Sequence, residues 1–485
     1  MLMTLVRLIE SAVRKFARSA RAPVQVSVTK GKSWYRNVCM VGGSVQQRSS
    51  KIILLVTLAS ALVFGNNANG QTIASGPAPP ELPRPSGRFG IGRAAFDWID
   101  PNRRSDMTED IGPHAELMVY VWYPTESVVN EKVKGILFPG VKQIDSAQGV
   151  SVPLKAKMFG GNWTSVVLGA ITSHAVENAL IAKDPKVFPV ILFSPGAFGT
   201  SFQYSSIIED LVSHGYIVAA IEHTSEVFAV VFPDGRVHVY SETRIPKESI
   251  PPPGSTKEEY EGKLEAWYRH NVDVRAADIS FVLDKLTDLN RNSNGTSQVF
   301  RRLDLDHVAV VGHSRGGWAA VVACRRDARI RACVNEDGNA GGQGLQYPGA
   351  SIPKASILYV EVSPVLKPGT TTDDWIVLKQ LHVTAEEWVQ QWHEKVVKEF
   401  STFPGGGYFV ELRVPGLEHY SFSDEVHLRA AKDGSEQKEE AALRDLRLTE
   451  DICRTFLDET LKNENRPILK TDSEMTVHHF PGKIR

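Results

Sequence analysis

The sequence is poor in features that would tie it to a metal, to nucleic acid or to a membrane interior. Its 485 residues include only 4 cysteines, and their spacing is not that of a metal site. The formal net charge is −1, so the overall charge gives no reason to expect nucleic acid as a partner. No internal repeat is visible. What remains is ordinary globular composition, 42% hydrophobic and 23% charged, with enough apolar mass for a large core.

The few cysteines limit the disulfides that the chain can form. They are Cys39, Cys324, Cys333 and Cys453. Cys39 falls in a segment that we expect to be removed, so at least one of the other three is unpaired or pairs between molecules. Cys324 and Cys333 lie on an expected helix and an expected strand, and both are interpreted as buried apolar side chains.

Long hydrophobic runs are also scarce, and the one near the start is short for a membrane span. It covers residues 52–65, follows a basic stretch and precedes small residues. This order is typical of a secretory signal, so residues 1–70 are expected to be a basic leader that is cut near Gly70-Gln71. The mature chain would then be secreted or periplasmic. A start at Met40 would give a signal of normal length; the alternatives are an organelle transit peptide and an uncleaved anchor formed by residues 52–65.

Composition divides the rest of the chain into three parts. Residues 71–87 are rich in Pro and Gly and are expected to be a linker. Residues 88–465 alternate apolar runs with helical patterns, which predicts an α/β domain with a mostly parallel, doubly wound sheet. Residues 466–485 are expected to be a C-terminal tail. The expected strands are Leu117–Tyr123, Phe188–Phe193, Tyr216–Ile221, His307–Val311, Ile330–Asn335, Ile357–Val362 and Tyr408–Val414. The expected helices are Ser205–His214, Ser255–Asn290, one directly after Ser314, and Thr449–Leu461.

One pentapeptide, residues 312–316 (Gly-His-Ser-Arg-Gly), carries the main chemical signal. It follows the β-branched run His307–Val311 and precedes a helix-forming run. A G-x-S-x-G sequence between a strand and a helix is typical of a nucleophile elbow, the sharp turn that holds a serine at the tip of a sheet. Ser314 is therefore the predicted nucleophile.

A serine nucleophile needs a histidine base and an acid that orients the base. The strand after Ser314 ends in an acidic pair before glycine, and we expect Asp337 to be the acid, with Glu336 as the alternative. His419 lies in the loop after the last core strand, where the base of such a site belongs. It is preferred over the other candidates, which are His223, His382 and His427.

Attack on a carbonyl also needs N–H donors for the oxyanion that forms. One donor is expected from Arg315, the residue after the nucleophile, and the other from Ala197 in the Pro-Gly turn after an early strand, with Phe198 as the alternative. The candidate pocket-lining residues are Phe198, His223 and Trp318, although structural support is a second interpretation of His223.

On these segments the chain resembles the platelet-activating-factor acetylhydrolase family of α/β-hydrolases. The likeness is carried by Phe193–Gly196, Ser213–His223, Val311–Gly317 and the loops of Asp337 and His419. The resemblance implies an α/β-hydrolase fold and a serine esterase that works through an acyl-enzyme, without a metal or an organic cofactor. It also implies a small-molecule or lipid ester as substrate, namely a short-chain acyl ester or an oxidised or short-chain phospholipid, and peripheral contact with a lipid surface.

Several features depart from the family's pattern. Pro195-Gly196 stands where members often have His-Gly, and Arg315 where they often have a small or hydrophobic residue. A capping box at Thr384 opens a helix with Trp388, Trp392, Val396 and Phe400 on one face, as a lid or a helix packed on the core. The alternatives for function are a polyester or cutinase-like hydrolase, an acyltransferase on the same fold, and a non-catalytic binding module.

Overall fold

The computed structural model describes part of the chain: residues 79–105, 113–126, 135–146, 168–240, 257–291, 298–338, 355–362, 384–400, 404–464 and 469–482. The chain divides into two units after Ala78, and every described residue belongs to the second. The expected leader, its cleavage site and most of the expected linker thus lie outside the described residues. Within the described part, no helix combines the length and the apolar character needed to cross a membrane.

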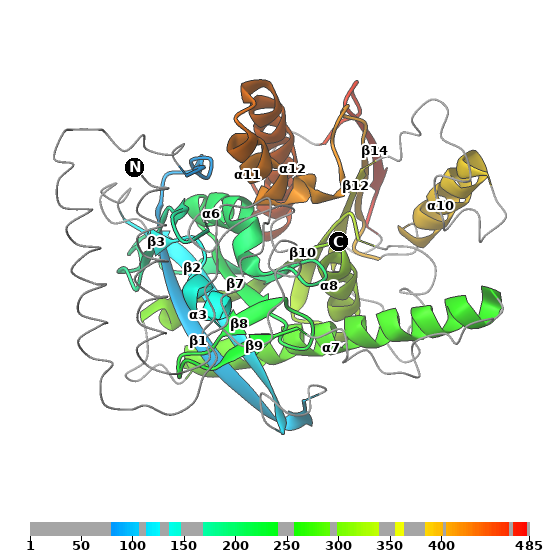
Figure 1. The fold of residues 1–485 in the computed structure, drawn as a ribbon. Helices are drawn as coiled ribbons and strands as arrows, with labels where there is room; N and C mark the ends of the chain where they lie inside the picture. The colour runs from blue at the N-terminus through cyan, green and yellow to red at the C-terminus, as the bar shows by residue number, and fades with distance from the viewer. Residues whose placement is uncertain are drawn as a thin grey trace, which may run out of the picture. The chain divides into compact units, whose positions relative to one another are not determined.

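A ten-stranded sheet runs through the second unit (Figure 1), in the order β14-β13-β12-β11-β10-β6-β7-β2-β1-β5. Its strands are β1 Gly90–Arg104, β2 His114–Thr125, β5 Ala175–Glu177, β6 Phe188–Ser194, β7 Ile217–Glu222, β10 Leu303–His313, β11 Ile330–Glu336, β12 Ser356–Val362, β13 Gly407–Leu412 and β14 Met475–Phe480. The strands from β13 through β7 are parallel, whereas β14 and β2 run antiparallel to their neighbours. This is the mostly parallel α/β sheet that the sequence predicts.

Helices cover both faces of the sheet. Those on one face include α6 and α12, whereas α7 and α8 pack on the other. The helices are α3 Val141–Ser146, α6 Ser205–Ser213, α7 Lys257–Arg291, α8 Arg315–Arg326, α10 Ala385–Phe400, α11 Asp424–Asp433 and α12 Glu436–Lys462, with short 3₁₀ turns η2 Ser201–Tyr204, η5 Gln298–Arg302 and η6 His419–Phe422. Two small antiparallel pairs complete the unit: β3 Gly135–Ile136 with β4 Thr172–Ser173, and β8 Ala229–Val231 with β9 Val237–Val239.

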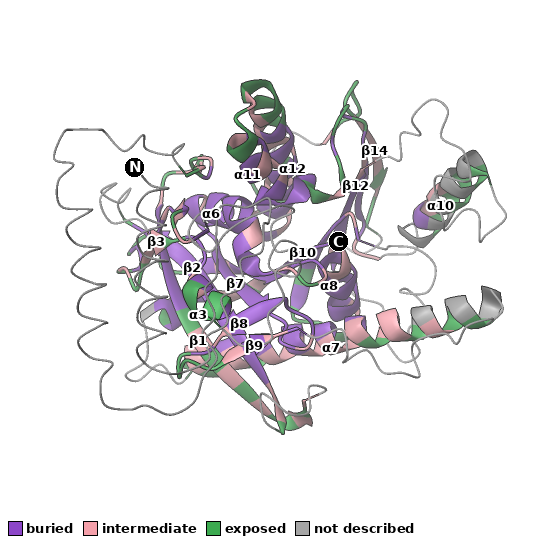
Figure 2. Cartoon of the chain, viewed as in Figure 1, coloured by how far each residue is buried: buried purple, intermediate pink, exposed green. Residues whose placement is uncertain are grey.

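The central strands are buried on both faces, as the purple ribbons of Figure 2 show. Side chains alternate between the faces of a strand, so β2 places Val119 and Val121 in one hydrophobic core and Tyr120 and Trp122 in the other. Burial of one such large side chain contributes about 1.5–3 kcal/mol. Continuous apolar strands are therefore stable only between two helical layers, which explains why the strand predictions were good in the middle of the sheet.

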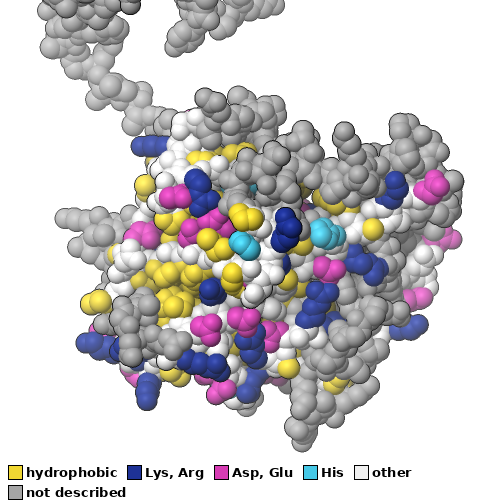
Figure 3. Space-filling model, turned by 90° about the horizontal axis from the view of Figure 1, so that it is seen from below, with side chains coloured by type: hydrophobic (Ala, Val, Ile, Leu, Met, Phe, Trp, Pro, Cys, Tyr) yellow, Lys and Arg dark blue, Asp and Glu magenta, His cyan; other side chains and the backbone are white. Residues whose placement is uncertain are grey.

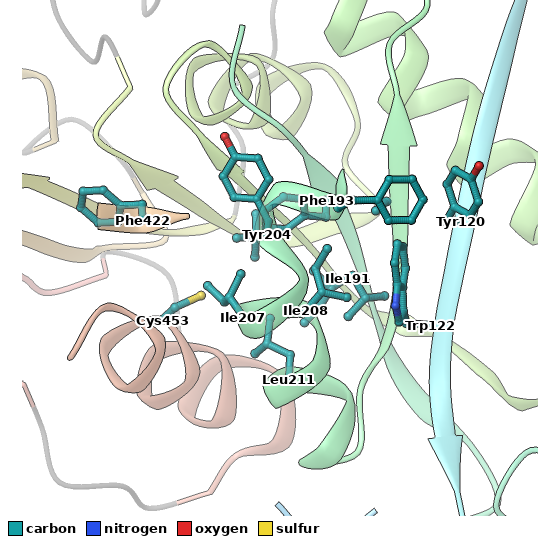
Figure 4. Close-up of a cluster of buried hydrophobic side chains, with 14 of the residues drawn as sticks. Tyr120, Trp122, Ile191, Phe193, Tyr204, Ile207, Ile208, Leu211, Phe422 and Cys453 are labelled. Atoms are coloured by element: carbon teal, nitrogen blue, oxygen red, sulfur yellow. The ribbon is translucent and has the colours of Figure 1, made fainter. Parts of the chain in front are cut away.

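Helix α6 illustrates this packing at close range (Figure 4). Ile207, Ile208 and Leu211 are all buried, and Ile207 and Leu211 share a face because they are four residues apart. Figure 4 shows them between the sheet residue Ile191 and Cys453 of α12. The helix thus lies between the sheet and α12. The turn η2, which ends at Tyr204, comes directly before it in the chain.

The outer surface carries charges of both signs. On the face seen in Figure 3, basic and acidic side chains are interspersed, and hydrophobic side chains gather between them. This mixture agrees with the formal net charge of −1.

Two boundary predictions were wrong. The expected C-terminal tail contains β14, which pairs with β13 along the edge of the sheet. A short edge strand with polar residues lacks the apolar run by which buried strands are detected. At the other end, Leu82 of the expected linker is buried in the core, and the Ser86 N–H donates to Asp210 Oδ1 at 2.7 Å. The folded unit therefore begins by Pro79.

Cys324 and Cys333 are both buried, as the sequence predicts, and the structure pairs them, a point that the sequence leaves open. They form a disulfide with a Cα–Cα distance of 6.4 Å, which joins α8 to β11. The sequence shows that both positions are buried, but it does not show that the two elements lie side by side. Cys453 is free and buried, so it is the unpaired cysteine among those described.

Candidate active site

Ser314 lies at the sharp turn between β10 and α8. Its backbone has φ 54° and ψ −123°, a conformation that L-residues rarely adopt and that strains the turn. Gly312 and Gly316 permit it, because a Cβ on Gly312 would overlap the Gly316 backbone and a Cβ on Gly316 would overlap the Ser194 carbonyl. The Ser314 N–H donates to the Glu336 carbonyl oxygen at 2.8 Å, which ties the turn to β11.

The three side chains expected to act together form one hydrogen-bonded chain. His419 Nδ1 donates to Asp337 Oδ2 at 2.5 Å, and His419 Nε2 lies 3.0 Å from Ser314 Oγ. The carboxylate can only accept, so Nε2 is left without a proton and accepts from the serine hydroxyl. The His419 side chain is 40% exposed, so the chain is accessible from solvent.

Hydrogen bonds to strand β12 hold Asp337 in place. Its backbone has φ 50°, its N–H donates to the Val360 carbonyl, and its Oδ1 accepts from the Val362 N–H at 3.0 Å. Strand β12 therefore fixes the carboxylate that faces His419.

Glu336, the alternative acid, is oriented differently. It is 1% exposed, and neither of its carboxylate oxygens has a hydrogen-bond partner among the described residues. Burial, reinforced by nearby Glu450, raises the pKa of Glu336 well above its usual range. The structure thus brings Asp337, and not Glu336, to His419.

The loop expected to supply an oxyanion donor is held by a buried arginine. Arg275 donates from Nη1 to the Pro195 carbonyl at 2.6 Å and from Nη2 to the Gly196 carbonyl at 3.2 Å. In a trans peptide the N–H points opposite to the C=O. Because the Gly196 carbonyl faces Arg275, the N–H of Ala197 faces away from Arg275.

That loop lies directly against the nucleophile turn. A Cβ on Gly196 would lie 3.5 Å from Ser314 Cβ. No described residue accepts a hydrogen bond from the Ala197 N–H. Arg315 is the first residue of α8, where N–H groups lack partners within the helix. Both expected donors thus belong to segments that flank Ser314.

A buried relay joins this loop to the loop of His419. The Gly196 N–H donates to Tyr204 Oη at 3.0 Å, Tyr204 Oη lies 2.9 Å from His313 Nδ1, and His313 Nε2 lies 2.8 Å from the His419 carbonyl. The carbonyl only accepts, so Nε2 carries the proton and Nδ1 accepts from Tyr204. Burial lowers the pKa of His313 well below its usual range, which keeps the ring neutral.

A second Ser-His-Asp chain lies beneath the first. His223 Nε2 accepts from Ser194 Oγ at 2.8 Å, and His223 Nδ1 donates to Asp278 Oδ2 at 2.7 Å. All three residues are at most 2% exposed, so no substrate reaches them. Burial, followed by the charge of Arg275, lowers the pKa of His223 to about 4. His223 therefore supports the loop from inside, so the structure favours structural support, the second of the two interpretations, over pocket lining.

The other candidate pocket-lining residues and the alternative histidine bases differ in how far their side chains are exposed. Phe198 is 39% exposed at φ 60° in the loop after Ala197, so it can line an open site. Trp318 is only 8% exposed and packs in the core under α8, because that face of the helix covers the sheet. His427 is buried and bonds the Glu81 carbonyl, whereas His382 lies outside the described residues. The expected helix with Trp388 corresponds to α10, where Val396 is buried.

The Arg315 side chain does not project freely into the site. It forms an ion pair with Glu226, and Glu226 also accepts from Arg275 Nε at 2.6 Å. Its guanidinium lies 5.0 Å from the Trp267 ring centroid and 4.8 Å from that of Tyr268. Burial lowers the pKa of Arg315 to about 10. One carboxylate thus links both arginines behind the loop of Ala197.

Arg275, Tyr204 and Glu226 are not among the site residues predicted from the sequence. A signal for Arg275 existed: it stands within the apolar stripe of α7, beside Val272, Ala276 and Ile279. A charged residue there is buried with a partner or a role.

A cavity of about 620 Å³ lies elsewhere, lined by residues that include Ser86, Arg88, His214 and Lys462. Pro189 of β6 also lines it, whereas Ser194 at the other end of β6 adjoins the nucleophile turn. This cavity is therefore separate from the chemistry at Ser314.

The chain is similar in sequence to one family model and to several curated proteins. A family model described as platelet-activating factor acetylhydrolase, isoform II, matches residues 78–339, a range that includes Ser314 and Asp337 but ends before His419. A protein of Arthroderma benhamiae named "Probable 1-alkyl-2-acetylglycerophosphocholine esterase" is 23% identical over 270 residues, 54% of this chain and 60% of that protein. The platelet-activating factor acetylhydrolase of Canis lupus familiaris is 28% identical over 200 residues, 39% of this chain and 43% of the relative.

The matches thus span about half the length of these relatives. Among solved structures, a ferulic acid esterase from Streptomyces cinnamoneus is similar with a TM-score of 0.55 and 24% identity, over 82% of this chain and 99% of that one. This likeness, together with the mostly parallel sheet and its helices, shows the α/β-hydrolase fold.

Proposed function

The chain belongs to the platelet-activating factor acetylhydrolase isoform II family, and from this we propose that it is a serine carboxylic-ester hydrolase. The observation that carries the proposal is the position of His419, with Nε2 3.0 Å from Ser314 Oγ and Nδ1 2.5 Å from Asp337. A serine hydroxyl becomes nucleophilic when such a base takes its proton and an acid stabilises the imidazolium.

In the proposed reaction, Ser314 Oγ attacks the ester carbonyl while His419 Nε2 takes the hydroxyl proton. Asp337 holds the ring and offsets its positive charge. His419 then gives the proton to the leaving alcohol, and an acyl-enzyme remains. Water, activated by the same histidine, releases the acid and restores Ser314. Every step uses groups of this chain, so the proposed cycle needs no metal or organic cofactor.

The N–H groups of Ala197 and Arg315 are proposed to bind the oxyanion. Such donors act only when they are held in place before charge develops. Arg275 supports this role for Ala197, since it holds the Gly196 carbonyl and thereby turns the Ala197 N–H outward. Glu226 ties Arg275 to Arg315, so the two donor segments are braced by one carboxylate.

Short acyl esters are the proposed substrates, including phospholipids with a short or oxidised acyl chain at the lipid surface. The names of the relatives, an esterase and an acetylhydrolase, favour this class. The exposed rings of Phe198 and Tyr420, from the loop of Ala197 and the turn of His419, offer apolar surface beside Ser314. A cutinase-like polyester hydrolase and an acyltransferase use the same chemistry and differ in the alcohol or the acceptor.

A panel of esters tests the proposal. We expect purified protein to hydrolyse p-nitrophenyl acetate and butyrate faster than octanoate and palmitate, and to release the short acyl group of a phospholipid. An amorphous polyester and an added alcohol acceptor test the two alternatives. Failure to cleave any ester, under conditions where the protein is folded, would reject the proposed function.

Secretion is proposed as well. Two observations support it: the basic and apolar leader, and the Cys324–Cys333 disulfide, a bond that persists mainly in oxidising compartments. We expect the mature N-terminus near Gln71. Sequencing the N-terminus of protein from the native source tests this, and a mature protein that retains residues 10–30 would contradict it.

A further inference from the structure

Three side chains with metal-binding atoms meet near the β14 edge of the sheet, outside the candidate active site. His393 comes from α10, Glu411 from β13 and His478 from β14. Their ligand atoms all lie within 4.8 Å of one another. Figure 1 shows α10 on the side of the sheet that ends in β14. None of the three residues takes part in the chemistry proposed for Ser314.

The fold brings these residues together by strand register. His478 pairs with Phe409 across β13 and β14. Glu411 is two residues beyond Phe409, so its side chain lies on the same face as Phe409 and diagonally beside His478. Helix α10 meets β13 through buried Val396, and His393 is one helical turn earlier on the same side.

The two distances from Glu411 to the histidines bracket the spacing of ligand atoms around a tetrahedral zinc ion. Glu411 Oε2 lies 3.0 Å from His478 Nε2 and 3.7 Å from His393 Nε2. Around a zinc ion with bonds of about 2.0–2.2 Å, neighbouring ligand atoms are about 3.4 Å apart, between these two values. The Phe409 ring lies 5.8 Å from the His393 ring and 5.3 Å from the His478 ring, which restricts the orientation of both imidazoles.

We propose that His393, Glu411 and His478 bind a zinc ion, which ties α10 and β14 to β13. Two imidazoles and one carboxylate suit zinc, whereas calcium and magnesium prefer oxygen ligands throughout. Water would complete the four-coordinate shell. The ligands are accessible to an ion, since the side chains of His393 and His478 are 37% and 31% exposed.

One positive charge competes for the same carboxylate. Arg413 Nη2 lies 4.0 Å from Glu411 Oε2. The Arg413 side chain is 53% exposed, so it can turn into solvent when a cation binds. An exposed contact of this length is weak.

Zinc titration of the metal-free protein against a chromophoric zinc indicator tests the site. We expect one zinc ion per chain, bound with a micromolar or lower Kd, a tetrahedral Co²⁺ spectrum, and a higher Tm in the presence of zinc. His393→Gln and His478→Gln should each weaken binding by at least about a hundredfold and abolish the zinc-dependent rise in Tm.

His479→Gln is the matched control. His479 neighbours His478 but stacks on Tyr408 across the opposite face, with ring centroids 4.7 Å apart. It should bind zinc as the wild type does. Glu411→Gln, which keeps the size of the side chain, should also lose binding. The proposal is overturned if the wild type binds no zinc at micromolar concentrations, or if the His393, His478 and Glu411 variants bind zinc as well as the control does.

Discussion

The Tyr204 hydroxyl lies 2.9 Å from His313 Nδ1, deep inside the protein and next to the nucleophile. Through this contact the loop of Gly196 and the loop of His419 share one chain of hydrogen bonds. Burial raises the pKa of Tyr204 above its usual range, so the phenol keeps the proton that it donates. The two loops that flank Ser314 are therefore positioned by the same buried pair.

Tyr204→Phe should disturb both loops at once. The Gly196 N–H and His313 Nδ1 would lose their partner, and a buried unsatisfied polar group costs about 1–3 kcal/mol. We expect kcat for p-nitrophenyl acetate to fall about tenfold or more with KM nearly unchanged, and the free energy of unfolding to fall by about 2 kcal/mol. Steady-state kinetics and urea unfolding measure these changes. Wild-type kcat in a folded variant would show that the relay does not position the site.

Arg275→Lys should impair the proposed oxyanion hole while it keeps the positive charge. A lysine ammonium is compact and cannot reproduce the planar contacts to the two carbonyls and Glu226. Loss of an oxyanion donor costs about 10²–10³ in kcat, which is the upper limit expected here. Steady-state kinetics separate the effects on kcat and on KM. A lower kcat with an unchanged KM indicates that the oxyanion donors are mispositioned. An unchanged kcat contradicts the role of Arg275.

The adjacent acids Glu336 and Asp337 offer a matched pair of variants. Asp337→Asn should lower kcat/KM by about 10³–10⁴, because the amide no longer holds His419 in the required tautomer. Glu336→Gln should keep nearly full activity, since its carboxyl is buried away from His419. Kinetics of the two variants under identical conditions decide between them. Greater loss in Glu336→Gln would reverse the assignment of the acid.

The buried carboxyl group of Glu450, in helix α12, should make the free energy of unfolding depend on pH. Burial raises the pKa of Glu450 from its ordinary 4.5 to about 8. Between these values the unfolded chain has released the proton and the folded chain has kept it, so stability falls as the pH rises from about 4.5 to about 8. Glu450→Gln should flatten this dependence, by up to roughly 5 kcal/mol.

Urea unfolding at a series of pH values measures the Glu450 effect. Glu440→Gln, on the exposed side of the same helix, is the control and should follow the wild type. If Glu450→Gln and Glu440→Gln give the same pH profile, Glu450 is ionised in the folded protein and the expectation is wrong.

The central part of this fold was predictable because its strands are buried on both faces. Val308 to Val311 and Val190 to Phe193 form apolar runs that only a two-sided core stabilises. The sequence also predicted that Ser314, Asp337 and His419 would meet, since chain order and strand ends fix the edge at which they lie. Strand β1 was missed because it has no continuous apolar run: its outer half alternates half-buried and exposed residues and contains Pro101.

Contacts between distant segments could not be predicted in the same way. Neither the pairing of β14 with β13 nor the Cys324–Cys333 bond leaves a local pattern. The same holds for Ser194, His223 and Asp278, which repeat the residue types of the candidate site in a buried position. Exposure, which the sequence does not encode directly, separates the accessible Ser-His-Asp chain from the buried one.

Covalent labelling distinguishes the accessible Ser314 from the buried Ser194. The probe is a fluorophosphonate, and the measurement is the mass of the intact protein followed by mapping of the modified peptide. We expect one adduct, on Ser314, in the wild type and in Ser194→Ala, and no adduct in Ser314→Ala. An adduct on Ser194, or labelling that persists in folded Ser314→Ala, would contradict this expectation.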